Sequence, residues 1–228
     1  IVLPAAVKIT AALGLSIETG ATCPSGTPVF DAGAGTLTVA SSKTLSSSNQ
    51  VLTLTADDFD IAGGLDAGSA SVSMHTKSSR TIGVGVSKDV SISATTLSRI
   101  TAAGITIGGG QSTSINALGV DASLLAGIVT LVGGASSAVT FDSGVGSTFD
   151  SLAAQADGGV TVQAVISTTA GGIAFDGDKD NSGAISDAVT ISDGVTVTAK
   201  GLLDAKATTG GIKHAGAATL SAGAGIVL

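Results

Sequence analysis

The chain contains neither tryptophan nor tyrosine, and among its 228 residues it has one methionine, one cysteine and one glutamate. Charged residues make up 12% of the sequence, whereas about 25% is usual for soluble domains. Helices need Leu, Glu, Lys and Arg on their faces, so this scarcity disfavours a helical protein. The 33 glycines and the abundant Ser, Thr and Val residues favour thin, regular β structure instead.

Disorder is the alternative to be considered for a chain rich in Gly, Ser and Thr. Hydrophobic residues nevertheless account for 43% of the sequence, and the mean hydropathy is positive. Disordered chains are poor in Val, Ile and Leu. We therefore expect a folded chain.

Positive charge is also scarce. The only arginines are Arg80 and Arg99, and the formal net charge is −7. Without a basic patch, and with neither Tyr nor Trp, nucleic acid is a poor partner. No apolar run reaches the roughly 18 residues of a membrane span, because the longest one, 124–135, is interrupted by Thr and Gly. The lone Cys23 has no internal disulfide partner, and we expect it to be a small buried or loop residue.

The dominant feature of the sequence is a repeat. Segments 51–54 (VLTL), 71–74 (SVSM), 138–141 (AVTF) and 188–191 (AVTI) alternate apolar with small or hydroxyl residues. This alternation is typical of a strand buried on one side. Units of this kind follow one another every ~20–24 residues, each with two or three short apolar segments separated by Gly, Asp and Ser. Asn-Gly pairs are absent, which disfavours a meander of tight hairpins.

The repeat predicts an all-β protein whose short strands stack as a single-stranded parallel β-helix, or β-solenoid, of roughly ten coils. We expect one continuous domain over residues 1–228, with an irregular first coil over 1–35. Residues 71–90 and 91–113 are interpreted as two separate units, whereas unit 159–187 is longer than its neighbours. The extra residues predict an acidic loop insertion at 176–187.

Each of the five phenylalanines is followed directly by aspartate. In a coil, this pair predicts a ring that points inward at the end of a strand, followed by a carboxylate that accepts hydrogen bonds from the turn. The pairs begin at Phe30, Phe59, Phe141, Phe149 and Phe175. We therefore interpret Phe-Asp as a corner signal rather than as part of an active site.

Three phrases, TLTVASSKTL, VLTLTADDFDIAGGLDAGSASVSMHTKSSRTIGVG and LSRITAAGITIGGG, carry a resemblance to a known family. They resemble the filamentous-haemagglutinin type of large secreted repeat proteins, over about residues 36–210. The resemblance implies a right-handed β-helix, export to the cell surface or beyond, and an adhesive or fibre-forming role. Cell-surface carbohydrate or protein would then be a partner. The amino-terminal secretion domain of that family has no counterpart in this sequence.

The stretch FDGDKDNSGAISD, residues 175–187, is the strongest candidate for a metal site. Its acids are spaced like the oxygen ligands of an EF-hand-like calcium loop, at positions 1, 3, 5 and 12, with a carbonyl at position 7. The candidate ligands are Asp176, Asp178, Asp180, Ser182 and Asp187. A solvated acidic loop without an ion is the alternative. In either case the sequence favours stabilisation of a protruding corner over catalysis.

Catalytic signals are weak, and we expect no enzymatic activity. Asp57 and Asp58 are adjacent, so a strand would send them to opposite faces. His75 and His214 lie in different coils, and no Gly-x-Ser-x-Gly elbow is present. A β-helix enzyme acting on polysaccharide and a ligand- or ice-binding module with Thr-rich faces remain the alternatives.

The favoured interpretation is a structural, extracellular β-solenoid that forms a segment or subunit of a fibre or adhesin. The sequence begins IVL and ends GIVL, without a charged or proline-bearing cap. Uncapped solenoid ends expose strand edges. We therefore expect either that the sequence is part of a longer chain, or that its terminal coils stack end to end on another subunit.

Overall fold

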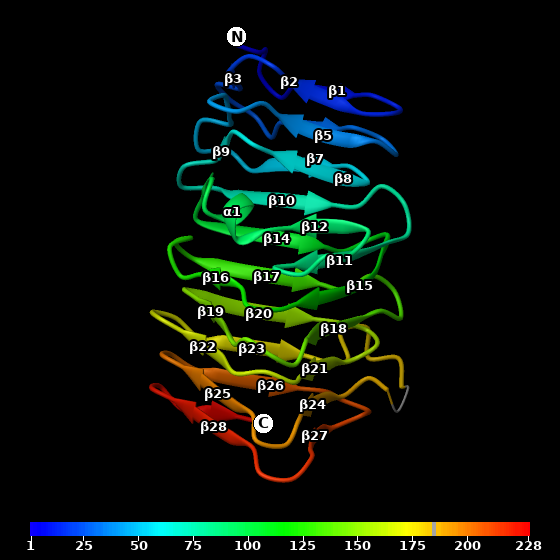
Figure 1. Ribbon diagram of the computed structural model, residues 1–228, viewed down its shortest axis with the longest axis vertical. Coiled ribbons are helices and arrows are strands. Elements are labelled where there is room, and N and C mark those ends of the chain that lie inside the picture. Colours follow the sequence, from blue (N-terminus) through cyan, green and yellow to red (C-terminus); the bar gives the residue numbers. More distant parts are fainter. Residues whose placement is uncertain (184–185) are drawn as a thin grey trace.

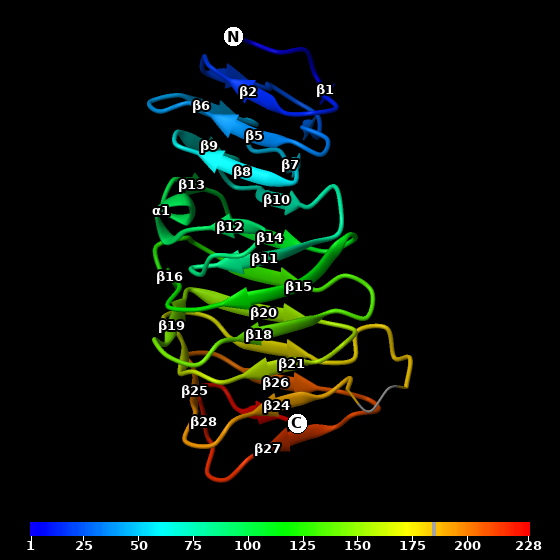
Figure 2. The same cartoon turned by 45° about the vertical axis from the view of Figure 1, so that its right-hand side comes forward.

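The computed structural model describes residues 1–183 and 186–228, and it shows a β-solenoid of about 9 turns. The chain winds from the N-terminal coil at one end of a rod to the C-terminal coil at the other (Figures 1 and 2). Successive coils contribute parallel strands to three faces of the rod. The predicted fold class is therefore confirmed.

The first face is a single sheet of ten strands, which we call the long sheet because it runs the whole length of the rod. Its strands, in spatial order, are β1 (Lys8–Thr10), β4 (Val29–Asp31), β7 (Leu52–Thr55), β10 (Ser71–His75), β14 (Gly104–Gly108), β17 (Ile128–Val132), β20 (Ser151–Gln155), β23 (Ile173–Asp176), β26 (Leu203–Lys206) and β29 (Ile226–Val227).

The second face is divided into two sheets. The N-terminal sheet contains β2 (Leu15–Ile17), β5 (Thr36–Val39) and β8 (Asp58–Ile61). The C-terminal sheet contains, in spatial order, β12 (Val90–Ile92), β11 (Arg80–Val84), β15 (Ser112–Ala117), β18 (Ala138–Phe141), β21 (Val160–Val162), β24 (Val189–Ile191) and β27 (Ile212–His214).

The third face is divided at the same level of the rod. Its N-terminal sheet contains β3 (Ala21–Thr22), β6 (Thr44–Ser46), β9 (Gly64–Asp66) and β13 (Ile100–Thr101). Its C-terminal sheet contains β16 (Asp121–Ala122), β19 (Ser147–Phe149), β22 (Ile166–Thr168), β25 (Thr196–Ala199) and β28 (Thr219–Ala222).

The core is a set of apolar ladders that run along the rod axis. On the long sheet, registered parallel pairing stacks Val72 on Leu52 and Ile105 on Val72, and the ladder continues through Val129 and Leu152. These side chains are buried. Stacking equivalent positions removes each branched side chain from water on both sides, and full burial stabilises the fold by roughly 1.5–3 kcal/mol per residue. The alternation in the sequence is thus the direct cause of the rod.

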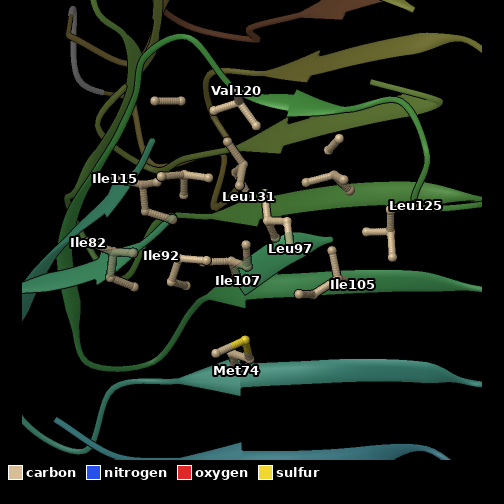
Figure 3. Close-up of a cluster of buried hydrophobic side chains, with 14 of the residues drawn as sticks. Met74, Ile82, Ile92, Leu97, Ile105, Ile107, Ile115, Val120, Leu125 and Leu131 are labelled. Carbon is tan, nitrogen blue, oxygen red and sulfur yellow. The ribbon is translucent and has the colours of Figure 1, made fainter. Parts of the chain in front are cut away.

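The coil of residues 71–103 interrupts two of the three faces, and we call it the seam. It holds the additional strand β12 and the only helix of the described chain, α1 (Ala94–Leu97). Strand β12 pairs with β11, and neither pairs with β8 of the N-terminal sheet. Ser93 caps α1 by accepting a 3.0 Å hydrogen bond from Thr96 N. Leu97 of α1 is buried with the neighbouring strands in the cluster that Figure 3 draws.

The seam explains why the rod has about nine turns rather than the roughly ten that the repeat predicts. Val72 pairs with Ile105, so a single coil spans both units that the sequence pattern separated at residue 90. The alternating segment at 90–92 forms β12, which pairs within the same coil. A second long coil separates Ile173 from its partner Leu203 and contains the acidic loop.

The stretch 1–35, for which the sequence predicts an irregular first coil, contains β1 to β4. Strands β1, β2 and β3 pair in parallel with β4, β5 and β6 of the next coil. Cys23 is buried, and this burial raises the pKa of its thiol. Among the described residues, no helix has the length and apolarity that crossing a membrane requires.

Candidate functional site

The acidic loop lies at the edge of the rod where the long sheet turns into the second face. It follows Phe175 and Asp176 at the end of β23 and leads into β24. It stands out from the regular outline of the coils in Figures 1 and 2. The predicted insertion at 176–187 includes residues 184 and 185, which lie outside the described part of the chain.

Asp176, the first candidate ligand, is bound to a lysine of the next coil. Its Oδ2 lies 3.0 Å from Nζ of Lys206, and its Oδ1 accepts a hydrogen bond from the backbone N of Asp178 at 3.3 Å. The hydrogen bond and charge of Asp176 raise the pKa of the Lys206 ammonium. Asp176 thus already has a positive partner, and it lies outside the group of acids that converge in the loop.

Three candidate ligands do converge, namely Asp178, Asp180 and Asp187. One carboxylate oxygen from each lies within 4.8 Å of the others. Asp178 and Asp187 are each only 2% exposed, whereas Asp180 faces solvent. We call these three residues the acidic triad. It is the only place in the described chain where three His, Cys, Asp or Glu side chains come this close.

Ser182, the fifth candidate, holds the triad together from within the loop. Its backbone N donates to Oδ1 of Asp180 at 3.1 Å, and its hydroxyl lies 3.5 Å from Oδ2 of Asp187. Ser186 donates its hydroxyl to Oδ1 of Asp187 at 3.0 Å. These contacts orient the carboxylates toward one another.

Asp178 provides an observation that is independent of the clustering. Its Oδ2 accepts a hydrogen bond from Thr209 N at 2.9 Å, but its Oδ1 is buried without a hydrogen-bond partner anywhere in residues 1–183 and 186–228. A buried carboxylate oxygen without a partner is costly, and the cost rises when other carboxylates are near. Two carboxylates about 5 Å apart repel by roughly 3 kcal/mol at an effective dielectric constant of about 20.

The neighbouring lysines do not neutralise Asp178. Lys179 reaches back to the preceding coil, where its Nζ lies 3.4 Å from Oδ1 of Asp157 and 3.4 Å from the carbonyl of Gly133. Lys206 is paired with Asp176. No ion pair in the described chain includes Asp178. The oxygens of Asp178, Asp180 and Asp187 are close enough together to hold a metal ion.

The Phe-Asp pairs occupy strand ends in four of five cases. Phe30, Phe141, Phe149 and Phe175 lie in the last two residues of their strands, whereas Phe59 lies within β8. All five rings are buried, and the ring of Phe141 lies 6.5 Å from that of Phe149 in an edge-to-face arrangement. Asp31 and Asp176 accept a hydrogen bond from the residue two positions ahead, as a corner requires.

The residues considered for catalysis are engaged in separate local contacts. Asp57 is buried and accepts a hydrogen bond from Ser78 N at 2.7 Å, whereas Asp58 is exposed and bonds the backbone N of Phe59. Nδ1 of His75 lies 2.6 Å from the carbonyl of Gly108, and Nδ1 of His214 lies 3.1 Å from the carbonyl of Gly216. The structure thus brings neither histidine together with Asp57 or Asp58.

Hydroxyl ladders decorate the outside of the rod in single columns. On the second face Thr140, Thr161 and Thr190 stack in register. On the long sheet the column of Thr106 and Thr130 ends at Ala153. These interrupted single columns differ from the regular flat array that an ice-binding surface would favour.

Sequence reasoning missed the cross-coil partners of the loop. Lys206 and Thr209 lie one coil further along the chain, and Asp157 lies one coil earlier. No local pattern marks these residues, because their proximity depends on the length of the coils between them. Only the register of the coils, which the sequence does not reveal, shows which segments face the loop.

Comparison of the chain with protein-family models, with curated proteins and with solved structures returned no match. No family match therefore supports the resemblance to filamentous-haemagglutinin proteins. The structure supports the broader statement that the chain is a β-helical repeat protein.

Proposed function

We propose that this protein is a structural rod of an extracellular or cell-surface fibre or adhesin, and that copies of the rod associate end to end. The observation that carries the proposal is the arrangement of both rod ends. β1 is the outermost strand of the long sheet at one end and β29 at the other, and all ten strands of the sheet are parallel.

We propose a second copy of this chain as the occupant of these two strand edges. A coil added beyond β29 in the same direction would meet the three faces in the same order as the coils within the rod do. A translated copy could therefore continue the long sheet. Ile226, Val227 and Leu228 are exposed at one end, and Ile1 and Val2 at the other. Pairing β29 with β1 of another copy would cover Ile226, which is in register with the buried Leu203, and would satisfy open strand edges.

The faces of the rod are consistent with a structural rather than a catalytic role. Outward positions carry mainly hydroxyl and small residues, and the residues considered for catalysis (Asp57, Asp58, His75 and His214) make separate contacts. Hydroxyl-rich faces would offer hydrogen bonds to cell-surface carbohydrate or protein, the partners that the resemblance implies. A polysaccharide-acting enzyme is less well supported, because the acids and bases that line one edge of the described chain are engaged in ion pairs with one another.

The test of end-to-end association compares two lysine substitutions. We expect the unaltered protein to form rods longer than one molecule in electron micrographs and to sediment faster as concentration rises. Ile226→Lys, at the open edge of β29 and in register with the buried Leu203, should abolish both effects. Val145→Lys should not, because Val145 is 72% exposed on the side of the rod. A compact monomer at every concentration would contradict the proposal.

We also propose that the acidic triad binds calcium. Calcium takes about six to eight oxygen ligands at about 2.3–2.6 Å, so oxygens bound to one ion can lie up to about 5 Å apart. The triad oxygens, within 4.8 Å of one another, meet this condition. Magnesium demands a tighter octahedron and retains more water.

Equilibrium dialysis provides a direct measurement of the bound ion, since the chain has no Trp or Tyr to report binding by fluorescence. We expect one calcium ion per chain and weaker retention of magnesium. Asp180→Asn, at the solvent-exposed member of the triad, should reduce binding without disturbing the core. Retention of calcium in the variant equal to that in the unaltered protein would contradict this ligand set.

A further inference from the structure

The acidic triad lies at a junction between two consecutive coils. Asp178 uses one oxygen to accept the backbone N of Thr209, in the corner that follows β26, while its other oxygen is buried without a partner. The side chain of Asn181 accepts the hydroxyl of Thr208 at 2.8 Å. The segment of the acidic loop that carries the candidate ligands is therefore also the segment that binds the loop to the next coil.

Gly210 completes this junction by close backbone packing. A Cβ atom at Gly210 would lie 2.6 Å from the carbonyl group of Asp187, a separation that real Cβ atoms do not show. Residues 208–210 thus rest directly on two members of the triad. Any repulsion that pushes the triad carboxylates apart would act on this corner as well.

The coil beyond the corner has few buried side chains. None of residues 206–228 is buried, and only partly buried side chains such as Ile212 and Leu220 pack against the core. In a solenoid each coil is stabilised by its own contacts and by its interface with its neighbours. Its strands β27, β28 and β29 pair in parallel with β24, β25 and β26 of the preceding coil, and the corner contacts at 208–210 add to this backbone pairing.

We propose that the cation bound by Asp178, Asp180 and Asp187 is an inter-coil clasp, which fixes the coil of residues 207–228 to the rod. The inference rests on the proposed calcium site and adds a regulatory role to it. With calcium bound, Asp178 is held where it accepts from Thr209 N. Without calcium, repulsion within the triad moves Asp178 away from that position and releases the corner.

Hydrogen exchange of backbone amides tests the clasp on the full chain. With calcium at about ten times its dissociation constant, linkage predicts that exchange of the amides of 207–214 slows by about tenfold. Asp178→Asn should abolish the slowing, although asparagine keeps a carbonyl oxygen for Thr209 N. Asp60→Asn, an exposed acid on the distant β8, is the matched control and should behave like the unaltered protein.

Calcium binding, measured by dialysis on the same samples, separates the two proposals. Calcium bound without any change in the exchange of 207–214 would overturn the clasp and leave the calcium site standing. Absence of bound calcium would overturn both. If Asp178→Asn fails to fold, Asp180→Asn gives the same comparison at an exposed position, and unchanged calcium-dependent protection in that variant would overturn the clasp.

Discussion

Individual residues along one edge of the rod connect its coils by charge. All four ion pairs of the described chain lie where the long sheet turns into the second face: Lys77–Asp31, Arg80–Asp57, Lys179–Asp157 and Lys206–Asp176. Each pair joins residues from different coils. The chain has few charges, and at this edge lysine and arginine side chains pair with carboxylates of other coils. Without these cations the carboxylates would repel one another along the rod axis.

The pair of Lys77 with Asp31 gives a prediction at the residue scale. The hydrogen bond from Lys77 is the largest cause of a lowered pKa for the Asp31 carboxyl, assisted by the backbone N of Gly33 and opposed by burial. A carboxyl with a lowered folded-state pKa stabilises the fold above its unfolded-state pKa. This contribution is lost as pH falls through the folded-state pKa.

Lys77→Met should therefore reduce the free energy of unfolding at pH 7 by at most about 1 kcal/mol, since Lys77 is half exposed. The difference from the unaltered protein should shrink below about pH 4 and vanish once Asp31 is protonated in both states. Urea unfolding across this pH range measures it. Lys200→Met, at an exposed lysine without an ion pair in the described chain, is the control; an equal, pH-independent loss in both variants would contradict the assignment.

At the scale of elements, the sequence predicted which segments form strands better than it predicted the face of the rod on which each strand lies. The segments at 51–54, 71–74, 138–141 and 188–191 all form strands. However, the first two belong to the long sheet, whereas the last two belong to the second face. Period-two alternation reports only that one side of a strand is buried, and every face of a solenoid buries one side.

The seam could not be predicted for a related reason. Residues 90–92 carry the same alternation as the start of a coil, and they lie about one repeat after 71. Whether such a segment begins a new coil or pairs within the old one depends on tertiary packing. The spacing of the acids predicted the acidic triad. It did not predict that Asp176 pairs with Lys206, because this pairing depends on a register that the sequence does not reveal.

The helix α1 gives a prediction at the element scale. Leu97 is buried where the sheets of two faces are interrupted, so its side chain replaces part of the contact that strand pairing supplies elsewhere. Leu97→Ala should lower the free energy of unfolding by about 2–5 kcal/mol. Leu124→Ala is the matched control, because Leu124 is 91% exposed, and its effect should stay within about 0.5 kcal/mol.

Thermal and urea unfolding followed by circular dichroism measure both leucine variants. Because a solenoid is stabilised by nearest-neighbour interfaces, weakening the seam should also separate the unfolding of the two halves into distinct transitions. Equal stability of the two variants would show that α1 contributes little to the junction.

At the scale of the whole molecule, the proposed functions have different locations on the rod. End-to-end association would use the strand edges of β1 and β29, whereas the calcium clasp acts at the last corner of the rod. The clasp holds the coil that carries β29, so calcium should favour assembly if both proposals hold. The sides of the rod, with their hydroxyl ladders, would remain available for contacts with other molecules.

The seam also affects how the rod responds to force. Only the long sheet crosses it with strand-to-strand hydrogen bonds, so the two halves are joined stiffly along one side and by side-chain packing along the other two. A sideways load should open the packed sides and bend the rod about the long sheet. In a fibre built from such rods, one compliant joint would recur about every 43 Å, the length of about nine turns at about 4.8 Å each. The fibre would then yield in a preferred direction while retaining its tensile continuity.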